Sequence, residues 1–266
     1  MSASICQDRQ RIQTVHLYCV LAVLLSFACN LSRAASLPSS TTLPVTFATT
    51  VEAGKIKIND PVRVHTMQTV ILPDGTRIPK GTVIVGHITQ SVPFQFDQTP
   101  YAKQKPSSLG IHFDRIELKN GPQPVSFEVR AIAGAYAVED ASRPVNTTEQ
   151  QITGQYVQVG GDTYWPPDDK VQSRSGDIVA YIRKEGIFAR PLSAAASSSE
   201  PGIVCDTIPQ EQAVAVFSAS ACGLYGVSDA VLESNGSNGS GTFVLASRKR
   251  SVFILAHSAA LLEVAP

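Results

Sequence analysis

The block from Asp74 to Gly86 constrains the fold more than any other part of the sequence. It runs Asp-Gly-Thr-Arg-Ile-Pro-Lys-Gly-Thr-Val-Ile-Val-Gly, so that two glycine-containing corners lie on either side of Pro79 and precede a β-branched run. Glycine accepts the positive φ that tight turns need, and proline fixes φ at about −65°. We therefore predict structural turns at Asp74, Gly75, Pro79, Gly81 and Gly86, separated by short strands.

A second strong signal is the Asn120-Gly121 pair, which lies between apolar runs over 109–118 and 125–133. Asn-Gly between such runs is typical of a β-hairpin, so Asn120 and Gly121 are predicted as further turn residues, with the two runs paired. In the first run the apolar positions slip by one residue, and this slip predicts a β-bulge near Asp114.

In the second run, apolar side chains alternate with polar or charged ones. Strict alternation is typical of a strand with one face on the core and the other in solvent. The face predicted to be buried carries Val125, Phe127, Val129, Ala131 and Ala133. The face predicted to be exposed carries Ser126, Glu128 and Arg130.

Short β-branched or aromatic runs recur along the rest of the chain, and turn-forming residues bound them. The predicted fold class is all-β: a β-barrel or sandwich of antiparallel hairpins, with a long irregular insertion and an N-terminal signal helix. We predict a signal peptide over 1–35 and a first barrel part over 36–134. Residues 135–200 are predicted as an insertion and linker. Residues 201–266 then form a C-terminal β segment that completes the barrel or makes a small β domain.

The N-terminus has the pattern of a cleavable signal peptide. Two arginines precede an apolar run over 15–28, and the small residues around Ala34 suit cleavage after Ala34 or Ala35. The run is shorter than the about 20 apolar residues of a membrane span. We expect export, to the periplasm or outside the cell. The alternative is an uncleaved N-terminal anchor, which would then supply the membrane contact.

The charge balance argues against nucleic-acid binding, and the cysteine content agrees with export. The chain has 22 basic and 22 acidic residues, a balance that lacks the electrostatic footprint of a nucleic-acid-binding protein. Its one basic run, over 248–250, lies between two apolar runs and is predicted as a solvated hairpin turn.

Beyond the leader two cysteines remain, Cys205 and Cys222, and an even pair in an oxidising compartment predicts a disulfide. Two buried free thiols are the alternative.

Candidate catalytic and metal-binding residues are weak. His87 and His112 lie on strands that can be neighbours, which makes a zinc site conceivable, but neither has an acidic or cysteine partner at ligand spacing. The segment Ser218–Gly223 lacks the Gly-x-Ser-x-Gly pattern of a hydrolase elbow. We predict no catalytic residue, no metal ligand and no cofactor.

One aromatic pair is a candidate for ligand contact. Tyr164 and Trp165 lie in a polar stretch with Asp162, Asp168 and Asp169. Exposed aromatics are suited to binding a glycan or a partner, whereas buried ones would pack this stretch onto the barrel. The aspartates lack the spacing of a calcium loop, so an exposed polar loop is expected there.

Residues 55–134 also contain a family pattern. It begins with Asp74-Gly75 and Ile78-Pro79-Lys80-Gly81-Thr82 and continues with a strand ending in Gly86. Phe113, Arg115, Ile116 and a turn at Gly121 follow. This pattern resembles the C-terminal β-barrel of TrbI-type conjugation proteins, the envelope-spanning channel subunits of type IV secretion. The resemblance implies barrel hairpins and envelope partners. The chain departs from the family in its missing Pro-rich spacer and helical antenna. The segment 216–226 is similar to uncharacterised secreted proteins of soil bacteria.

From these observations we expect an exported, envelope-associated β-rich protein of structural or protein-interaction type rather than an enzyme. Its expected partners are envelope proteins or a second copy of the chain, and no nucleic acid. An extracytoplasmic ligand- or glycan-binding module is the first alternative. A hydrolase with an unrecognised site is the second, and a cleft that brings His87 or His257 near Ser218 or an aspartate would favour it.

Overall fold

A computed structural model gives the fold of the protein. It describes residues 37–143, 156–157, 159–160, 163–164, 169–173, 175–193, 205, 207–234 and 241–265. All of these belong to one unit, Leu37–Pro266. The predicted signal helix lies outside the described residues, as does Trp165.

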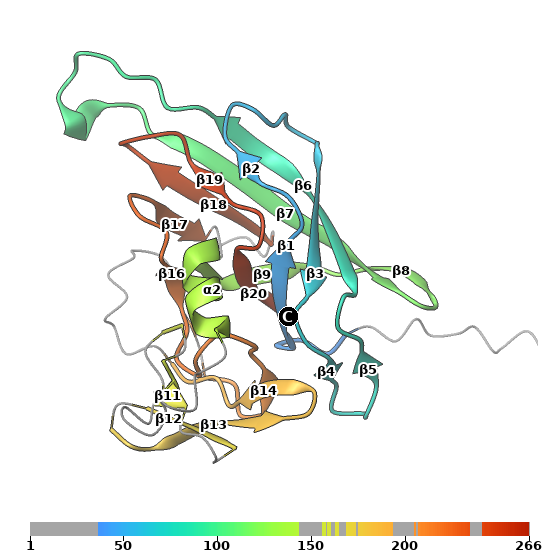
Figure 1. Cartoon of the computed structure of the whole chain (residues 1–266). Helices are drawn as coiled ribbons and strands as arrows, with labels where there is room; N and C mark the ends of the chain where they lie inside the picture. The colour runs from blue at the N-terminus through green and yellow to red at the C-terminus, as the bar shows by residue number, and fades with distance from the viewer. Residues whose placement is uncertain are drawn as a thin grey trace, which may run out of the picture. The chain divides into compact units, whose positions relative to one another are not determined.

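A ten-stranded sheet is the largest sheet of the described chain (Figure 1). Its order is β16 (Gly223–Tyr225), β9 (Phe127–Ala133), β20 (Ala259–Val264), β1 (Thr42–Phe47), β3 (Pro61–Thr66), β6 (Val83–Val92), β7 (Ser107–Leu118), β18 (Thr242–Ser247) and β17 (Val231–Ser234), with β8 (Gly121–Pro124) paired to β7. Neighbours are antiparallel, except that β16 runs parallel to β9. The end strands β16 and β17 approach each other, so the sheet is a nearly closed barrel. The predicted all-β barrel class is confirmed.

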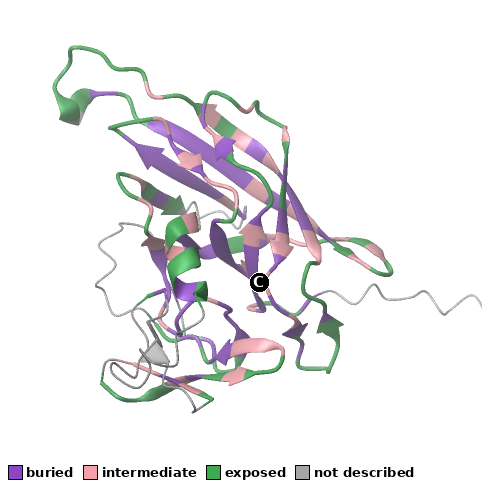
Figure 2. Cartoon of the chain, viewed as in Figure 1, coloured by how far each residue is buried: buried purple, intermediate pink, exposed green. Residues whose placement is uncertain are grey.

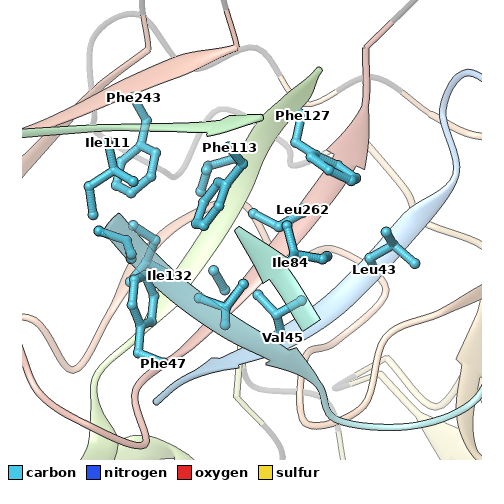
Figure 3. Packing of buried hydrophobic residues seen from close by; sticks show 14 of the residues in the cluster. Leu43, Val45, Phe47, Ile84, Ile111, Phe113, Phe127, Ile132, Phe243 and Leu262 are labelled. Atoms are coloured by element: carbon cyan, nitrogen blue, oxygen red, sulfur yellow. The ribbon is translucent and has the colours of Figure 1, made fainter. Parts of the chain in front are cut away.

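The inside of the barrel is filled by aromatic and branched aliphatic side chains. Phe113 and Phe243 stack with ring centroids 6.1 Å apart, and Figure 3 shows them beside Phe127, Ile111 and neighbouring side chains. Their strands are far apart in the sequence, so burial of these rings holds distant segments together. The hydrophobic effect of such burial is about 25 cal/mol per Å² of apolar surface.

Two β-bulges bend the long pair β6–β7. In their register Val85 faces Arg115 but Gly86 faces Phe113, which leaves Asp114 as the extra residue. Further along, Ile88 and the residue two positions later pair with consecutive residues of β7, so Thr89 is extra as well. Bulges increase strand bending and twist, which a closing barrel requires. The bulge predicted near Asp114 is confirmed.

The strand that follows the Asn120-Gly121 turn was wrongly predicted. β7 pairs with the short β8, and Val125 N–H still donates to the Asp114 carbonyl oxygen of β7 at 3.0 Å. Only Phe127–Ala133 form β9, which pairs with β20 and β16 instead. The physical reason lies in Pro122 and Pro124. Proline cannot donate to a strand ladder, so β8 stays short and at an edge before the chain turns away.

A second sheet is built from the middle of the chain. Its six antiparallel strands are β10 (Tyr156–Val157), β11 (Thr163–Tyr164), β12 (Lys170–Gln172), β13 (Ile178–Arg183), β14 (Gly186–Ala189) and β15 (Gln212–Ala213). The helix α2 (Ala135–Ser142) precedes it. Two small pairs complete the structure, β2 (Val51–Glu52) with β19 (Phe253–Ile254) and β4 (Val70–Ile71) with β5 (Arg77–Ile78).

The second sheet and α2 pack on the outer face of the barrel. Their cluster joins Val171 and Ala180 of the sheet and Val138 of α2 to Ala131 and Leu261 of the barrel. Both faces of β9 are therefore covered along its second half. Its simple alternation also ends there, because the register of β9 against β20 shifts at Leu261.

Arg130 was predicted to face solvent and is instead 4% exposed. The segments that cover it come from distant parts of the chain.

Gln68 is a second buried polar residue, and it connects the end of β3 to the second sheet. Its side-chain oxygen accepts hydrogen bonds from the backbone N–H groups of Ile187 and Ala215, and its side-chain nitrogen donates to the carbonyl oxygen of Ile187.

Candidate functional site

The predicted turn at Asp74 and Gly75 lies between β4 and β5. The Asp74 carboxylate accepts hydrogen bonds from the Thr76 backbone N–H at 2.8 Å and from the Thr76 hydroxyl at 2.9 Å. The backbone bond, followed by the hydroxyl bond, holds the pKa of Asp74 below its ordinary value. Gly75 has φ +83°, so this hairpin needs glycine at its tip.

The corner at Pro79 and Gly81 is tied to the end of β3 by Thr66. The Thr66 hydroxyl donates to the Pro79 carbonyl oxygen at 2.7 Å and accepts from the Thr82 N–H at 2.9 Å. The Thr66 carbonyl oxygen accepts from Gly81 N–H at 2.8 Å. These bonds fix the direction in which β6 enters the barrel. Thr66 is a residue that sequence reasoning missed, because its partners are not adjacent in the chain.

Of the other predicted turn residues, Asn120 and Gly121 lie at a turn and Gly86 does not. Asn120 lies in the turn between β7 and β8, and Gly121 starts β8 with φ +111°. Gly86 does not lie at a turn but inside β6, opposite the bulge of β7. A Cβ atom at Gly86 would come 2.2 Å from the His112 carbonyl oxygen, so glycine is needed there for close approach of two backbones.

The predicted disulfide is confirmed, and it joins Cys205 to Cys222. Next to it Arg130 donates from Nε to the Ala221 carbonyl oxygen at 3.0 Å and from Nη2 to the Leu192 carbonyl oxygen. A buried guanidinium that serves main-chain carbonyls holds loops in place, because each carbonyl would otherwise lack a partner. This disulfide is typical of an oxidising, extracytoplasmic compartment.

The structure describes only part of the aromatic pair proposed for ligand contact. Tyr164 lies in β11, where its backbone pairs with Tyr156 of β10 and Val171 of β12. Trp165 lies outside the described residues. A ligand role for Tyr164 and Trp165 stays a prediction.

The two histidines are direct neighbours on the outer barrel face. His87 pairs in register with His112, and Asp114 lies beside both: His87 Nδ1 is 2.9 Å from one carboxylate oxygen and His112 Nε2 is 3.5 Å from the other. The Thr242 hydroxyl lies 3.3 Å from His112 Nδ1. The acidic partner that the sequence did not reveal is thus the bulge residue. This network ties β6, β7 and β18 together, and within the described residues no three His, Cys, Asp or Glu side chains are arranged to hold a metal ion.

Ser218 lies elsewhere, between Phe217 and Ala219, which belong to the cluster that the second sheet forms with the barrel. Its side chain is buried, its hydroxyl lies 3.3 Å from that of Ser220, and its N–H donates to the Val159 carbonyl oxygen. His87 Nδ1 makes its hydrogen bond with Asp114. Among the described residues no hydrogen bond joins Ser218 to His87 or His257.

Comparison with known proteins gives no relative. No family model matches the chain, and neither a curated protein nor a solved structure is similar to it. The relation to TrbI-type barrels therefore stays a prediction. In the part of the chain that the structure describes, no helix combines the length and apolar character needed to cross a bilayer.

The connection between β6 and β7, residues 93–106, forms an arm beyond the ends of these strands (Figure 1). It contains a short 3₁₀ helix, η1 (Tyr101–Lys103). Phe96 is 78% exposed and Tyr101 is 55% exposed, and Figure 2 shows the arm as largely exposed. Large aromatics are strong contributors to binding when a partner covers them. Neither Phe96 nor Tyr101 was identified as a candidate site from the sequence.

Hydrogen bonds within the arm hold its shape. The buried Gln104 side chain donates to the carbonyl oxygens of Asp97 at 3.3 Å and Thr99 at 3.2 Å. The Asp97 carboxylate accepts from the Thr99 hydroxyl and N–H, and these two bonds hold the pKa of Asp97 below its ordinary value. At the base of the arm, Phe94 N–H donates to the Ser251 hydroxyl at 2.9 Å.

A cavity of about 400 Å³ lies where the barrel nearly closes. We call it the closure cavity. Three segments line it: the end of β9 with the start of α2, the link between β16 and β17, and the chain from the end of β18 to the start of β20. The basic run 248–250 belongs to this last segment. It is exposed, as predicted, but it connects strands that pair with different partners and is not a hairpin turn.

Proposed function

We propose that this chain is an exported, envelope-associated protein that acts by contact with another protein through the arm. The single observation that carries the proposal is a hydrogen-bonded arm that presents exposed Phe96 and Tyr101. An arm already held in one shape loses little conformational entropy when a partner binds. The Cys205–Cys222 disulfide supports export, since such bonds persist in oxidising compartments.

The chemistry of the arm defines the partner. Lys103 and Lys105 are exposed beside the two aromatics, whereas Asp97 is engaged by Thr99. A partner surface with an apolar pocket and an acidic rim would complement this arrangement, because apolar contact supplies affinity and opposite charge steers the encounter. An envelope protein is the proposed partner, and a second copy of the chain is an outcome that the test below distinguishes.

Site-specific photocrosslinking in cells that express the full chain tests the arm. A photoreactive amino acid at Phe96 should give a discrete adduct, and Tyr101→Ser should weaken it. The matched control is the same amino acid at Ile178, which is 46% exposed on the second sheet. Mass spectrometry of the adduct separates an envelope protein from a second copy. Equal adducts at both positions, or none at Phe96, would contradict the proposal.

Export has its own test. The intact mass of the protein recovered from a fractionated culture should correspond to a chain starting at Ala35 or Ser36, after loss of the leader. Reduction should add the mass of the hydrogens on Cys205 and Cys222. A chain that stays with the cytoplasmic fraction at its full mass would contradict export while leaving the arm contact to be judged separately.

A further inference from the structure

We propose that the closure cavity binds a small amphipathic carboxylate, whose apolar body enters the cavity and whose carboxylate meets Arg250. The proposal does not depend on the arm contact, although Ser251 of the cavity wall also accepts the hydrogen bond from Phe94 at the base of the arm. Its volume of about 400 Å³ lies in the usual range for sites of small organic ligands.

The inner wall of the cavity is apolar. Ile132, Val252 and Ile254 line it, and all three belong to the barrel core cluster. Val227 from the β16–β17 link is partly buried against the same cluster. A ligand body in contact with these side chains would be removed from water, which favours a hydrocarbon chain over a sugar or a nucleoside.

Arg250 supplies charge at the rim. Its Nη2 donates to the carbonyl oxygen of Ser228 at 2.9 Å and to the Ser228 hydroxyl at 2.7 Å, and its guanidinium carbon lies 5.1 Å from the centre of the Phe253 ring. These contacts fix the guanidinium and use one of its nitrogens. Its other N–H groups have no partner among the described residues, and guanidinium groups bind carboxylates with two parallel hydrogen bonds.

Neighbouring charges leave the cavity positive. The adjacent carboxylate, Asp229, pairs with Lys249, and their hydrogen bond lowers the pKa of Asp229 and raises that of Lys249. Among the described residues that line the cavity there is no Asp or Glu. The start of α2 is also in the wall, and its N-cap residue, Gly134, has no side chain that could cap the helix. The dipole at this N-terminus favours a negatively charged ligand, as Arg250 does. The assignment rests on the cavity and on Arg250.

Calorimetric titration of the purified full-length mature protein with decanoate tests the site, with decanol as the neutral ligand of equal chain length. Decanoate should bind with one-to-one stoichiometry. Arg250→Met should weaken decanoate binding by about tenfold, the loss expected for a charge-assisted hydrogen bond, and should leave decanol binding unchanged. The matched control Arg248→Met, in the same link but not in the cavity wall, should change it by less than about twofold.

A filling variant tests the location. Ala230 lines the cavity, and Ala230→Phe should abolish the binding of both ligands. Should this variant fail to fold, the wild-type amide NMR signals of residues 226–230 and 250–255 provide the readout, and decanoate should shift them. The proposal is overturned by the absence of saturable decanoate binding, by equal losses in the two arginine variants, or by shifts confined to other residues.

Discussion

At Gly86 a methyl group would have no room. The nearest atoms to an added Cβ are the carbonyl oxygen of His112 at 2.2 Å and the Cα of Phe113 at 3.0 Å, and both belong to the backbone of β7. Backbone atoms in the middle of a sheet cannot rotate away as a side chain can. At Gly75 nothing lies within 4 Å, and only the positive φ disfavours another residue.

This contrast predicts different costs for two glycine substitutions. Gly86→Ala should lower the free energy of unfolding by about 3 kcal/mol, because it overpacks a rigid sheet. Gly75→Ala should cost about 1 kcal/mol, the strain of a left-handed conformation. Urea unfolding of both variants measures the difference. A larger loss for Gly75→Ala, or equal losses, would show that β6 can move away from β7.

The pair of Asp229 and Lys249 predicts a pH dependence at both ends of the scale. The pKa of Asp229 is lowered, so its stabilisation is present above the unfolded-state value and is lost as pH falls through the folded value. The pKa of Lys249 is raised, so its stabilisation is present below the unfolded-state value and is lost as pH rises through the folded value. The pair should therefore stabilise most between these limits.

The measurement is the free energy of unfolding of wild type and Asp229→Asn at acid, neutral and strongly alkaline pH. Asparagine suits the site because Asp229 has φ +63°, a conformation that Asn tolerates. The two proteins should differ at neutral pH and converge at both extremes. Lys249→Met, which removes the other partner, should show the same profile. A difference that persists at acid pH would assign the effect to something other than charge.

At the scale of elements, the arm and the strands that carry it should behave as separate units of stability. β6 and β7 are long and lie inside the barrel sheet, whereas the arm is held by hydrogen bonds of Gln104 and Asp97 within it and by the bond from Phe94 at its base. Regions with few buried contacts open at lower free energy than the core.

Gln104→Ala should therefore loosen the arm without unfolding the barrel. We expect faster cleavage within residues 93–106 under limited proteolysis, with a fall in global unfolding free energy of less than about 1 kcal/mol. Gln90→Ala is a suitable control, since Gln90 also donates a side-chain hydrogen bond, to Ser108, but lies in the sheet. Unchanged cleavage in Gln104→Ala would show that other contacts shape the arm.

For the molecule as a whole, the disulfide should contribute to global stability. It closes a segment of 17 residues in sequence separation. In the chain-entropy model a loop of this size stabilises by about 3 kcal/mol. Unfolding of the double variant Cys205→Ser/Cys222→Ser, compared with oxidised and reduced wild type, measures this. The double variant should match the reduced protein, and an equal midpoint for all three samples would contradict the prediction.

The sequence was most informative where structure depends on neighbours in the chain. The glycine at position 75 and the slip between Phe113 and Ile116 both have local causes, and both predicted their structures. The pairing of β9 and the burial of Arg130 were missed because they depend on β20, Leu192 and Ala221, all distant in sequence. α2 was missed because only Val138 and Ala141 of its residues are buried, too few for a clear helical period.

The candidate sites were harder to predict for the same reason. Aromatic residues are more often buried than exposed, so nothing in the sequence distinguishes Phe96 from the core phenylalanines. The closure cavity takes its walls from three separate segments, and Asp114 reaches the two histidines only because a bulge turns it to their face. Such arrangements become visible only once the strand order is known.

The place of β20 in the barrel sets the timing of folding. β20 lies between β9 and β1 in the sheet, and its residue Glu263 pairs with Thr42 near the beginning of the described chain. The barrel therefore cannot close while the chain is still being synthesised upstream of β20. Topologies that join such distant segments fold slowly. The strands that precede β20 therefore stay in an open sheet until β20 itself has been synthesised.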